Sequence, residues 1–177
     1  MVKKIAIFFG YVSFFILALL YFTPKISLYY FAEQELKAFD IVVSSETLVD
    51  TGFSLKIQNP TINIKSIESA KIQELDITIL GLYNSVNISN IGLSSTAKSF
   101  LPLNIEYVNI THTIVDPLHI NAQVKGEFGE AQAVVNILDR NLSVVLLPSK
   151  LMKEKYANTL RNLKKSENGE FIYAKTF

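Results

Sequence analysis

Residues 131–147, AQAVVNILDRNLSVVLL, decide the fold class of this 177-residue chain. Apolar residues occupy every second position on both sides of Asp139-Arg140-Asn141, a short polar loop. Since side chains along a β-strand point alternately to its two faces, this period of two predicts a hairpin of two strands, each with one apolar face. The apolar positions are Ala131, Ala133, Val135 and Ile137 before the loop and Leu142, Val144 and Leu146 after it.

The same alternation recurs on the N-terminal side of the hairpin. It predicts a mainly β domain with an antiparallel, curved sheet of about eight strands. The alternation changes phase at Tyr107-Val108, which predicts a β-bulge, and residues 171–177 are predicted as a closing strand. The apolar positions of the other strands are Phe53, Leu55 and Ile57; Ile62 and Ile64; Leu75, Ile77 and Ile79; Val86 and Ile88; Leu103, Ile105 and Tyr107; and Ile120, Ala122 and Val124.

So much amphipathic strand in one small domain leaves two arrangements open. Either the sheet closes on itself as a barrel or sandwich, or it leaves an apolar trough. A trough would suit acyl chains or a strand of another protein. The residues that we expect to line it are Leu55, Ile57, Ile77, Ile79, Val135 and Ile137.

The N-terminus has the pattern of an uncleaved membrane anchor. Residues 5–22 form an uncharged run of eighteen residues, which as a helix spans about 27 Å and can cross a bilayer. No small-x-small site closes the run, so we expect a transmembrane anchor and not a signal peptide. Because Lys3 and Lys4 precede it, the positive-inside rule leaves residues 1–4 as a cytoplasmic tail and exports the rest. Abundant Ile, Lys and Asn are typical of AT-rich bacterial genomes, which predicts the inner membrane and a periplasmic C-terminal domain.

A second, juxtamembrane helix is predicted for residues 23–39. Thr23 is a favourable N-cap, and Pro24 suits the first helical position, where its missing N–H costs nothing. The periplasmic β domain then covers residues 40–177. The apolar stripe of the juxtamembrane helix consists of Leu28, Ala32, Leu36 and Phe39.

Residues 149–165 are predicted to form one amphipathic helix inside the β domain. Ser149 can cap it, and its apolar stripe consists of Met152, Tyr156, Leu160 and Leu163. Its other side is basic, with Glu154 as the only carboxylate. Such a face is either solvated or contacts anionic head groups or an acidic partner. The cations are Lys150, Lys153, Lys155, Arg161, Lys164 and Lys165.

The sequence shows few of the residue patterns that catalysis, metal binding or nucleic-acid binding requires. Cysteine is absent, which excludes disulfides and thiol catalysis. His112 and His119 are the only histidines, and their spacing is not that of a metal site. No serine lies in a recognised nucleophile motif for which either could act as the base. The net charge of +1 gives no basic footprint for nucleic acid. We therefore expect a protein that is not an enzyme, with no cofactor, no metal and no nucleic-acid partner.

The order of these segments resembles the AsmA-like envelope proteins and, among them, the N component of type II secretion systems. The resemblance is carried by the exit Thr23-Pro24-Lys25 after the anchor, the amphipathic segment 28–39, the meandering strands, and an ending of Leu147-Pro148-Ser149, a basic helix and residues 169–173. It implies an inner-membrane protein with a curved periplasmic sheet and a role in lipid handling or in assembling a secretion machine. The chain is shorter than such proteins usually are, which favours a local role.

The sequence therefore predicts a non-catalytic accessory protein of a secretion or envelope-assembly system, with the membrane and the proteins of that system as partners. The alternative is a lipid relay, similar to the anchored component of lipopolysaccharide export, that binds acyl chains in a β trough.

Overall fold

The computed structural model describes residues 2–95, 104–161, 163–166 and 168–177. The helices are α1 (Val2–Phe22), α2 (Lys25–Lys37), α4 (Lys150–Lys155) and α5 (Ala157–Leu160). The strands are β1 (Ile41–Ser44), β2 (Thr47–Asp50), β3 (Ser54–Gln58), β4 (Thr61–Ile64), β5 (Ile67–Ile79), β6 (Tyr83–Leu93), β7 (Ile105–Thr113), β8 (Asp116–Gly126), β9 (Gly129–Asn136), β10 (Asn141–Pro148), β11 (Lys164–Lys165) and β12 (Phe171–Thr176).

The chain is mainly β, with one N-terminal apolar helix and short C-terminal helices. Within the described residues twelve strands form a single sheet, so the expectation of about eight was too low. The strands that the sequence did not reveal are β1, β2 and β11, which have only four, four and two residues and therefore little room for a period of two. Leu103, which we expected in a strand, lies outside the described residues.

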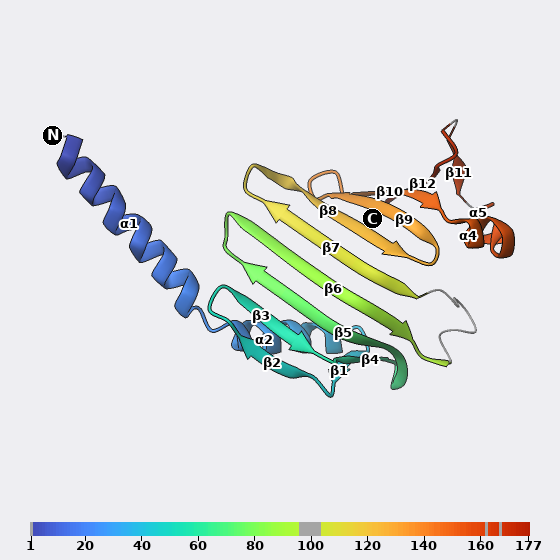
Figure 1. Cartoon of the computed structure of the whole chain (residues 1–177), viewed down its shortest axis with the longest axis horizontal. Coiled ribbons are helices and arrows are strands. Elements are labelled where there is room, and N and C mark those ends of the chain that lie inside the picture. The colour runs from blue at the N-terminus through green and yellow to red at the C-terminus, as the bar shows by residue number, and fades with distance from the viewer. Residues whose placement is uncertain (1, 96–103, 162, 167) are drawn as a thin grey trace.

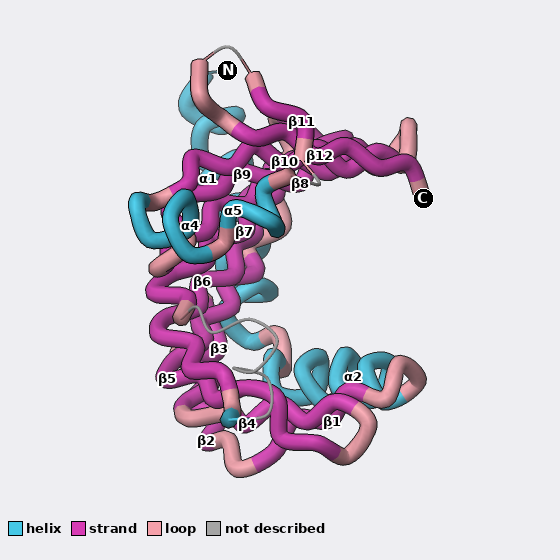
Figure 2. The backbone as a smooth tube through the Cα atoms, turned by 90° about the vertical axis from the view of Figure 1, so that its right-hand side faces the viewer, coloured by secondary structure: helices cyan, strands magenta, loops and turns pink. Residues whose placement is uncertain are grey.

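The sheet is open. Its strands follow the order β1-β4-β5-β6-β7-β8-β9-β10-β12-β11, with β3 pairing on β5 and β2 on β3, and the paired strands are antiparallel. The ends of the path do not pair with each other in the described part of the chain, so the closed-barrel alternative is wrong. Figure 1 shows the long strands β5 to β9 side by side, with α1 projecting away from the sheet. In Figure 2 both ends of the sheet turn toward the same side, where α2 lies.

The hairpin at residues 131–147 is confirmed, with Ala133 opposite Val144 and Val135 opposite Leu142. At its loop end β9 stops one residue earlier than expected, at Asn136, and Ile137 lies in the turn, about half exposed. The reason is local: the backbone N–H of Asp139 donates to Asn136 Oδ1 at 3.0 Å, and this turn ends the strand. The phase change near Tyr107 appears as a register shift between Ile105 and Tyr107 where β7 pairs with β8.

The single helix expected at residues 149–165 is wrong. The chain forms α4, breaks at Tyr156, forms the one-turn α5 and then enters β11, where Lys164 and Lys165 pair with Ile172 and Phe171. Pairing with β12 is non-local and overrides the helical period. The expected apolar stripe nevertheless packs, because Met152 and Leu160 are buried against Leu146, with Tyr156 and Leu163 beside them. Ser149 caps α4 as expected, accepting from the Met152 N–H at 3.1 Å.

The start of α2 also differs from expectation. The helix begins at Lys25, and Pro24 is the cap residue, without a side-chain hydrogen bond. Thr23 instead follows the last residue of α1, and its Oγ1 donates back to the Leu19 carbonyl at 2.7 Å. A hydroxyl that turns back in this way cannot cap the following helix.

Candidate functional site

One face of the sheet is apolar from β3 to β12. Directly opposed residues of antiparallel strands point to the same face, so the strand registers define three parallel rows of side chains. We call this set the apolar face. The first row is Leu55, Ile77, Val86, Ile110, Ala122, Ala133, Val144 and Tyr173; the second is Ile57, Leu75, Ile88, Val108, Val124, Ala131, Leu146 and Phe171; the third runs from Ile79 through Asn84, His112, Ile120 and Val135 to Leu142.

Among the described residues, the apolar face is covered only at its ends. Leu55 and Ile57 are buried at the β3 end, and Leu146 is buried at the other end beneath α4 and α5. The face residues of β6 to β9 between them are half-buried. A shallow hollow of 200 Å³ lies on this middle part and is lined mainly by aliphatic side chains, among them Ile77, Val86, Ile110 and Ile120.

The cover that α2 provides is loose. Two hollows of 130 and 190 Å³ lie between α2 and the apolar face, and Tyr29, Ala32 and Ile77 line both of them. A hollow with apolar walls forfeits dispersion contacts, so α2 is not packed on the sheet as a core helix would be. The Tyr29 hydroxyl donates to Glu46 Oε1 at 3.2 Å, and burial, reinforced by the Glu46 charge, raises the pKa of Tyr29 well above its usual value.

The end of α1 is fixed to the same end of the sheet. Lys25 is almost completely buried, and its Nζ donates to the carbonyls of Leu20, Tyr21 and Thr23 at 3.0, 3.4 and 3.0 Å. The cation thereby satisfies carbonyls that the helix end leaves without partners. The ring of Tyr21 packs edge-on against Phe53, immediately before β3, with centroids 5.3 Å apart. The apolar face therefore begins beside the last turn of α1.

The residues expected to line a trough are largely brought together. Leu55, Ile57, Ile77, Ile79 and Val135 lie on the apolar face, whereas Ile137 lies in the turn after β9. The sequence did not reveal that α2 covers part of this face. The stripe Leu28, Ala32 and Leu36 was the available signal, but it suits a membrane surface as well as a sheet.

The six cations expected on one helix face are separated. Lys153, Arg161 and Lys165 surround a cavity of 630 Å³, whose other lining residues are Ala157, Leu160, Leu163, Gly169 and Phe171. Lys150 lies 3.9 Å from Glu154 in a pair that is exposed to solvent. Lys155 and Lys164 do not line the cavity, and like the three cations that do, they are exposed to solvent.

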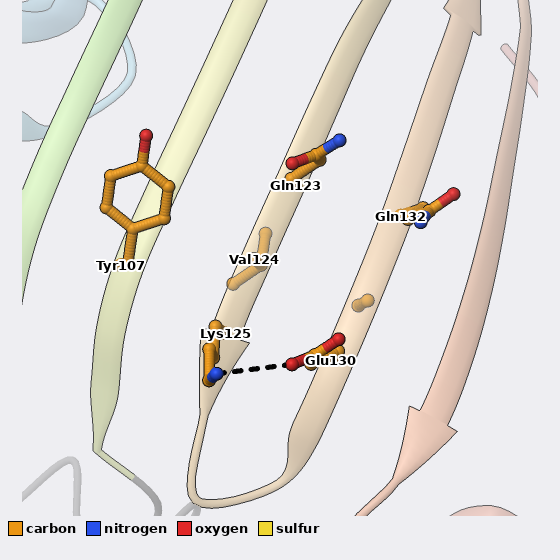
Figure 3. A pocket seen from close by; sticks show the side chains of 7 residues that line it. Tyr107, Gln123, Val124, Lys125, Glu130 and Gln132 are labelled. Atoms are coloured by element: carbon orange, nitrogen blue, oxygen red, sulfur yellow. Dashed lines mark ion pairs between the residues drawn. The ribbon is translucent and has the colours of Figure 1, made fainter.

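The opposite face of the sheet is polar, and several of its side chains hydrogen-bond to one another. Its side chains include Asn87, Asn109, Gln123 and Gln132, which occupy one row across β6 to β9. Asn87 Oδ1 accepts from Tyr107 and Asn109 at 3.0 and 2.6 Å. Figure 3 shows a hollow on this face, with Gln123 beside Gln132 and an ion pair of 3.3 Å between Lys125 and Glu130.

The two histidines cannot act together. His112 is opposite Ile120 and lies on the apolar face, whereas His119 is opposite Asn136 and lies on the polar face. His119 Nδ1 is 2.7 Å from Asp116 Oδ1, and its other ring nitrogen is 3.2 Å from Asn136 Nδ2. The two rings therefore lie on opposite faces of the sheet, so they cannot bind the same metal ion.

Helix α1 is long and apolar enough to cross a membrane, and none of its residues is buried in the protein. Comparisons with protein-family models, with curated proteins and with solved structures give no match to this chain.

Proposed function

We propose that this chain is a non-catalytic, inner-membrane-anchored protein of the bacterial envelope, whose periplasmic sheet curves into a trough and holds an acyl chain on its apolar face. The observation that carries the proposal is the uncovered middle of the apolar face, between α2 at one end and α4 and α5 at the other. An aliphatic sheet face left partly exposed costs free energy in water, and it is typical of a binding surface.

The dimensions suit a hydrocarbon chain. From β3 to β12 the face crosses seven interstrand steps, which at about 4.8 Å each give about 34 Å along the sheet. Each methylene group removed from water contributes about 0.8 kcal/mol, so a chain lying along even part of this face would bind without any polar contact.

The apolar face begins beside the end of α1, which gives an acyl chain a route from the membrane to the sheet. Since Tyr21 at the end of α1 packs against Phe53 beside β3, the start of the apolar face lies where the anchor would leave the bilayer. The apolar hollows beneath α2 lie at this same end. A lipid entering here would stay in contact with apolar surface, which is the behaviour required of the lipid relay that we inferred as the alternative from sequence.

A second candidate function is that of an accessory protein in a secretion or envelope-assembly system, as in the type II N component. The open edges of the sheet favour it. In the described part of the chain β1 pairs only with β4, and β11 only with β12, so each end offers backbone groups to a strand of another protein.

Two neighbouring positions on β8 test the acyl-chain proposal. Ile120 lies on the apolar face, and Asn121 is exposed on the polar face. We expect the full-length protein, purified from membranes in a mild detergent, to retain lipid that mass spectrometry detects. Ile120→Glu should lose that lipid while Asn121→Glu keeps it. Equal lipid retention by Ile120→Glu and Asn121→Glu would contradict the proposal. Co-purification of the same envelope protein with both variants would favour the accessory role.

The proposed orientation of α1, with the C-terminal domain in the periplasm, has its own test. A reporter that is active only in the periplasm, fused after Phe177, should be active, and the full-length protein should sediment with membranes. A soluble product shortened by about 22 residues would show that α1 is a cleaved signal and not an anchor.

A further inference from the structure

The cavity at the C-terminal end combines three cationic side chains with an apolar lining. Its volume is 630 Å³, within the range of small-molecule sites. Lys153 of α4, Arg161 after α5 and Lys165 of β11 contribute three cations from three separate positions along the segment. The apolar lining residues are Ala157, Leu160, Leu163 and Phe171.

The apolar part of this lining is firmly held. Leu160 is buried and packs with Met152 and Leu146, and Leu163 and Phe171 pack against the same cluster. Phe171 also belongs to the apolar face, through its pairing with Leu146. Lys165 is opposite Phe171 in the β11–β12 pair, so its side chain stands on the same side of the sheet.

The three cations lack acidic partners among the described residues. The ion pair of this segment joins Lys150 to Glu154, and both of these lie outside the cavity lining. Three like charges around one cavity repel one another, and an anion placed between them relieves that repulsion. An apolar floor, in turn, disfavours a small hydrated anion and favours one that carries a hydrocarbon chain.

We propose that this cavity binds the head group of an anionic phospholipid, with the phosphate among Lys153, Arg161 and Lys165 and the first methylenes of the acyl chain over Leu160, Leu163 and Phe171. The site deepens the proposed function by naming the head-group chemistry, but it uses different residues from the middle of the apolar face. The two proposals can therefore fail separately.

The test uses the full-length protein in a nonionic detergent and measures lipid binding by native mass spectrometry. The probes are phosphatidylglycerol and phosphatidylcholine with identical acyl chains, so that only the head-group charge differs. The cavity variant is Lys153→Gln, Arg161→Gln, Lys165→Gln. The matched control is Lys150→Gln, Lys155→Gln, Lys164→Gln, which removes the same charge from the same segment outside the cavity.

We expect the wild type and the control variant to bind phosphatidylglycerol at least tenfold more tightly than phosphatidylcholine. The cavity variant should bind the two lipids equally. Ala157→Trp, which fills the cavity from an exposed position and keeps every cation, should also abolish the preference. Ile120→Glu should leave the preference intact even where it removes the acyl chain from the sheet.

Three results would overturn the proposal. If the control variant loses the preference as strongly as the cavity variant, general charge attraction explains it. If millimolar inorganic phosphate displaces phosphatidylglycerol, the site is an anion site without a role for the acyl chain. If Ala157→Trp retains the preference, the lipid does not occupy the cavity. Circular dichroism checks that the sheet of each variant is folded. If the cavity variant is not folded, Ala157→Trp decides whether the lipid occupies the cavity.

Discussion

Lys25 Nζ lies 3.9 Å from Asp50 Oδ1, where the end of α1 meets the turn between β2 and β3. The lysine is almost fully buried, while the aspartate side chain keeps about a third of its surface in water. Asp50 also accepts from the Gly52 N–H at 2.8 Å, and that turn touches the ring of Tyr21. One buried cation therefore joins the C-terminal carbonyls of α1 to the first hairpin of the sheet.

We predict that Lys25→Met weakens this joint. The substitution leaves three backbone carbonyls without their donor, and an unsatisfied buried acceptor costs about 1–3 kcal/mol. Hydrogen exchange of residues 20–25 and 50–53 should accelerate, and the melting temperature of the full-length protein should fall. Lys71→Met is the matched control, because Lys71 pairs with Glu68 at 3.6 Å on the surface, where such a pair contributes little. Equal effects of the two substitutions would mean that Lys25 does not hold the joint.

The two faces of β5 are expected to respond oppositely to substitution. Ile77 faces the hollows under α2, and Ile77→Asp would place an unpaired charge on apolar surface at a cost of several kcal/mol. Asp76 is on the polar face, 4.0 Å from Lys56, and its Oδ1 has no hydrogen-bond partner among the described residues. Asp76→Ala should therefore change the melting temperature little. Denaturant unfolding of both variants checks this, and equal tolerance would show that the strand register is wrong.

Strand alternation made much of the apolar face predictable. The period of two placed Leu55, Ile77 and Val135 on one face, because neighbouring strands pair in register only when their apolar sides coincide. Ile137 could not be predicted, since the Asn136 side chain ends the strand through a hydrogen bond that the apolar pattern does not reveal. Local pattern also could not reveal β11, because two residues become a strand only by pairing with β12.

The arrangement of the basic segment at residues 149–165 also could not be predicted from local pattern. Lys153, Arg161 and Lys165 are equivalent to Lys150, Lys155 and Lys164 in sequence, as cations on the polar side of one expected helix. The break at Tyr156 and the pairing of β11 bring the first three around a cavity and leave the others outside it. Both events depend on contacts with residues 146 and 171–172, so neither could be read from the segment alone.

Tyr29 gives a prediction for alkaline pH. Burial and the neighbouring Glu46 raise the pKa of Tyr29, so the neutral phenol is favoured in the folded protein. This stabilisation is complete below the ordinary tyrosine pKa of about 10 and is lost as the pH rises through the folded-state pKa. In an absorbance titration at about 295 nm, the ionisation of Tyr29 should appear as a late step, above the ordinary tyrosine pKa. Tyr29→Phe should remove that late step and leave the rest of the curve, whereas an unchanged late step would assign it to another tyrosine.

Filling the space under α2 should separate stability from lipid binding. Ala32 lines both hollows between α2 and the apolar face, so Ala32→Phe adds apolar atoms where the protein has none. Each added methylene equivalent that becomes buried contributes up to about 0.8 kcal/mol, and we expect the free energy of unfolding to rise by about 1 kcal/mol. The same ring would occupy the route of an acyl chain, so the lipid retained by the purified protein should fall.

Gln34→Phe is the control for this substitution, because it adds a ring to an exposed position of α2 that lines neither hollow. It should leave lipid retention unchanged. Should Ala32→Phe instead lower the free energy of unfolding, the added ring is overpacked, and α2 must sit closer to the sheet than the hollows require. Should it raise stability without reducing bound lipid, the acyl chain reaches the middle of the apolar face without passing beneath α2, directly over the face of β6 to β9.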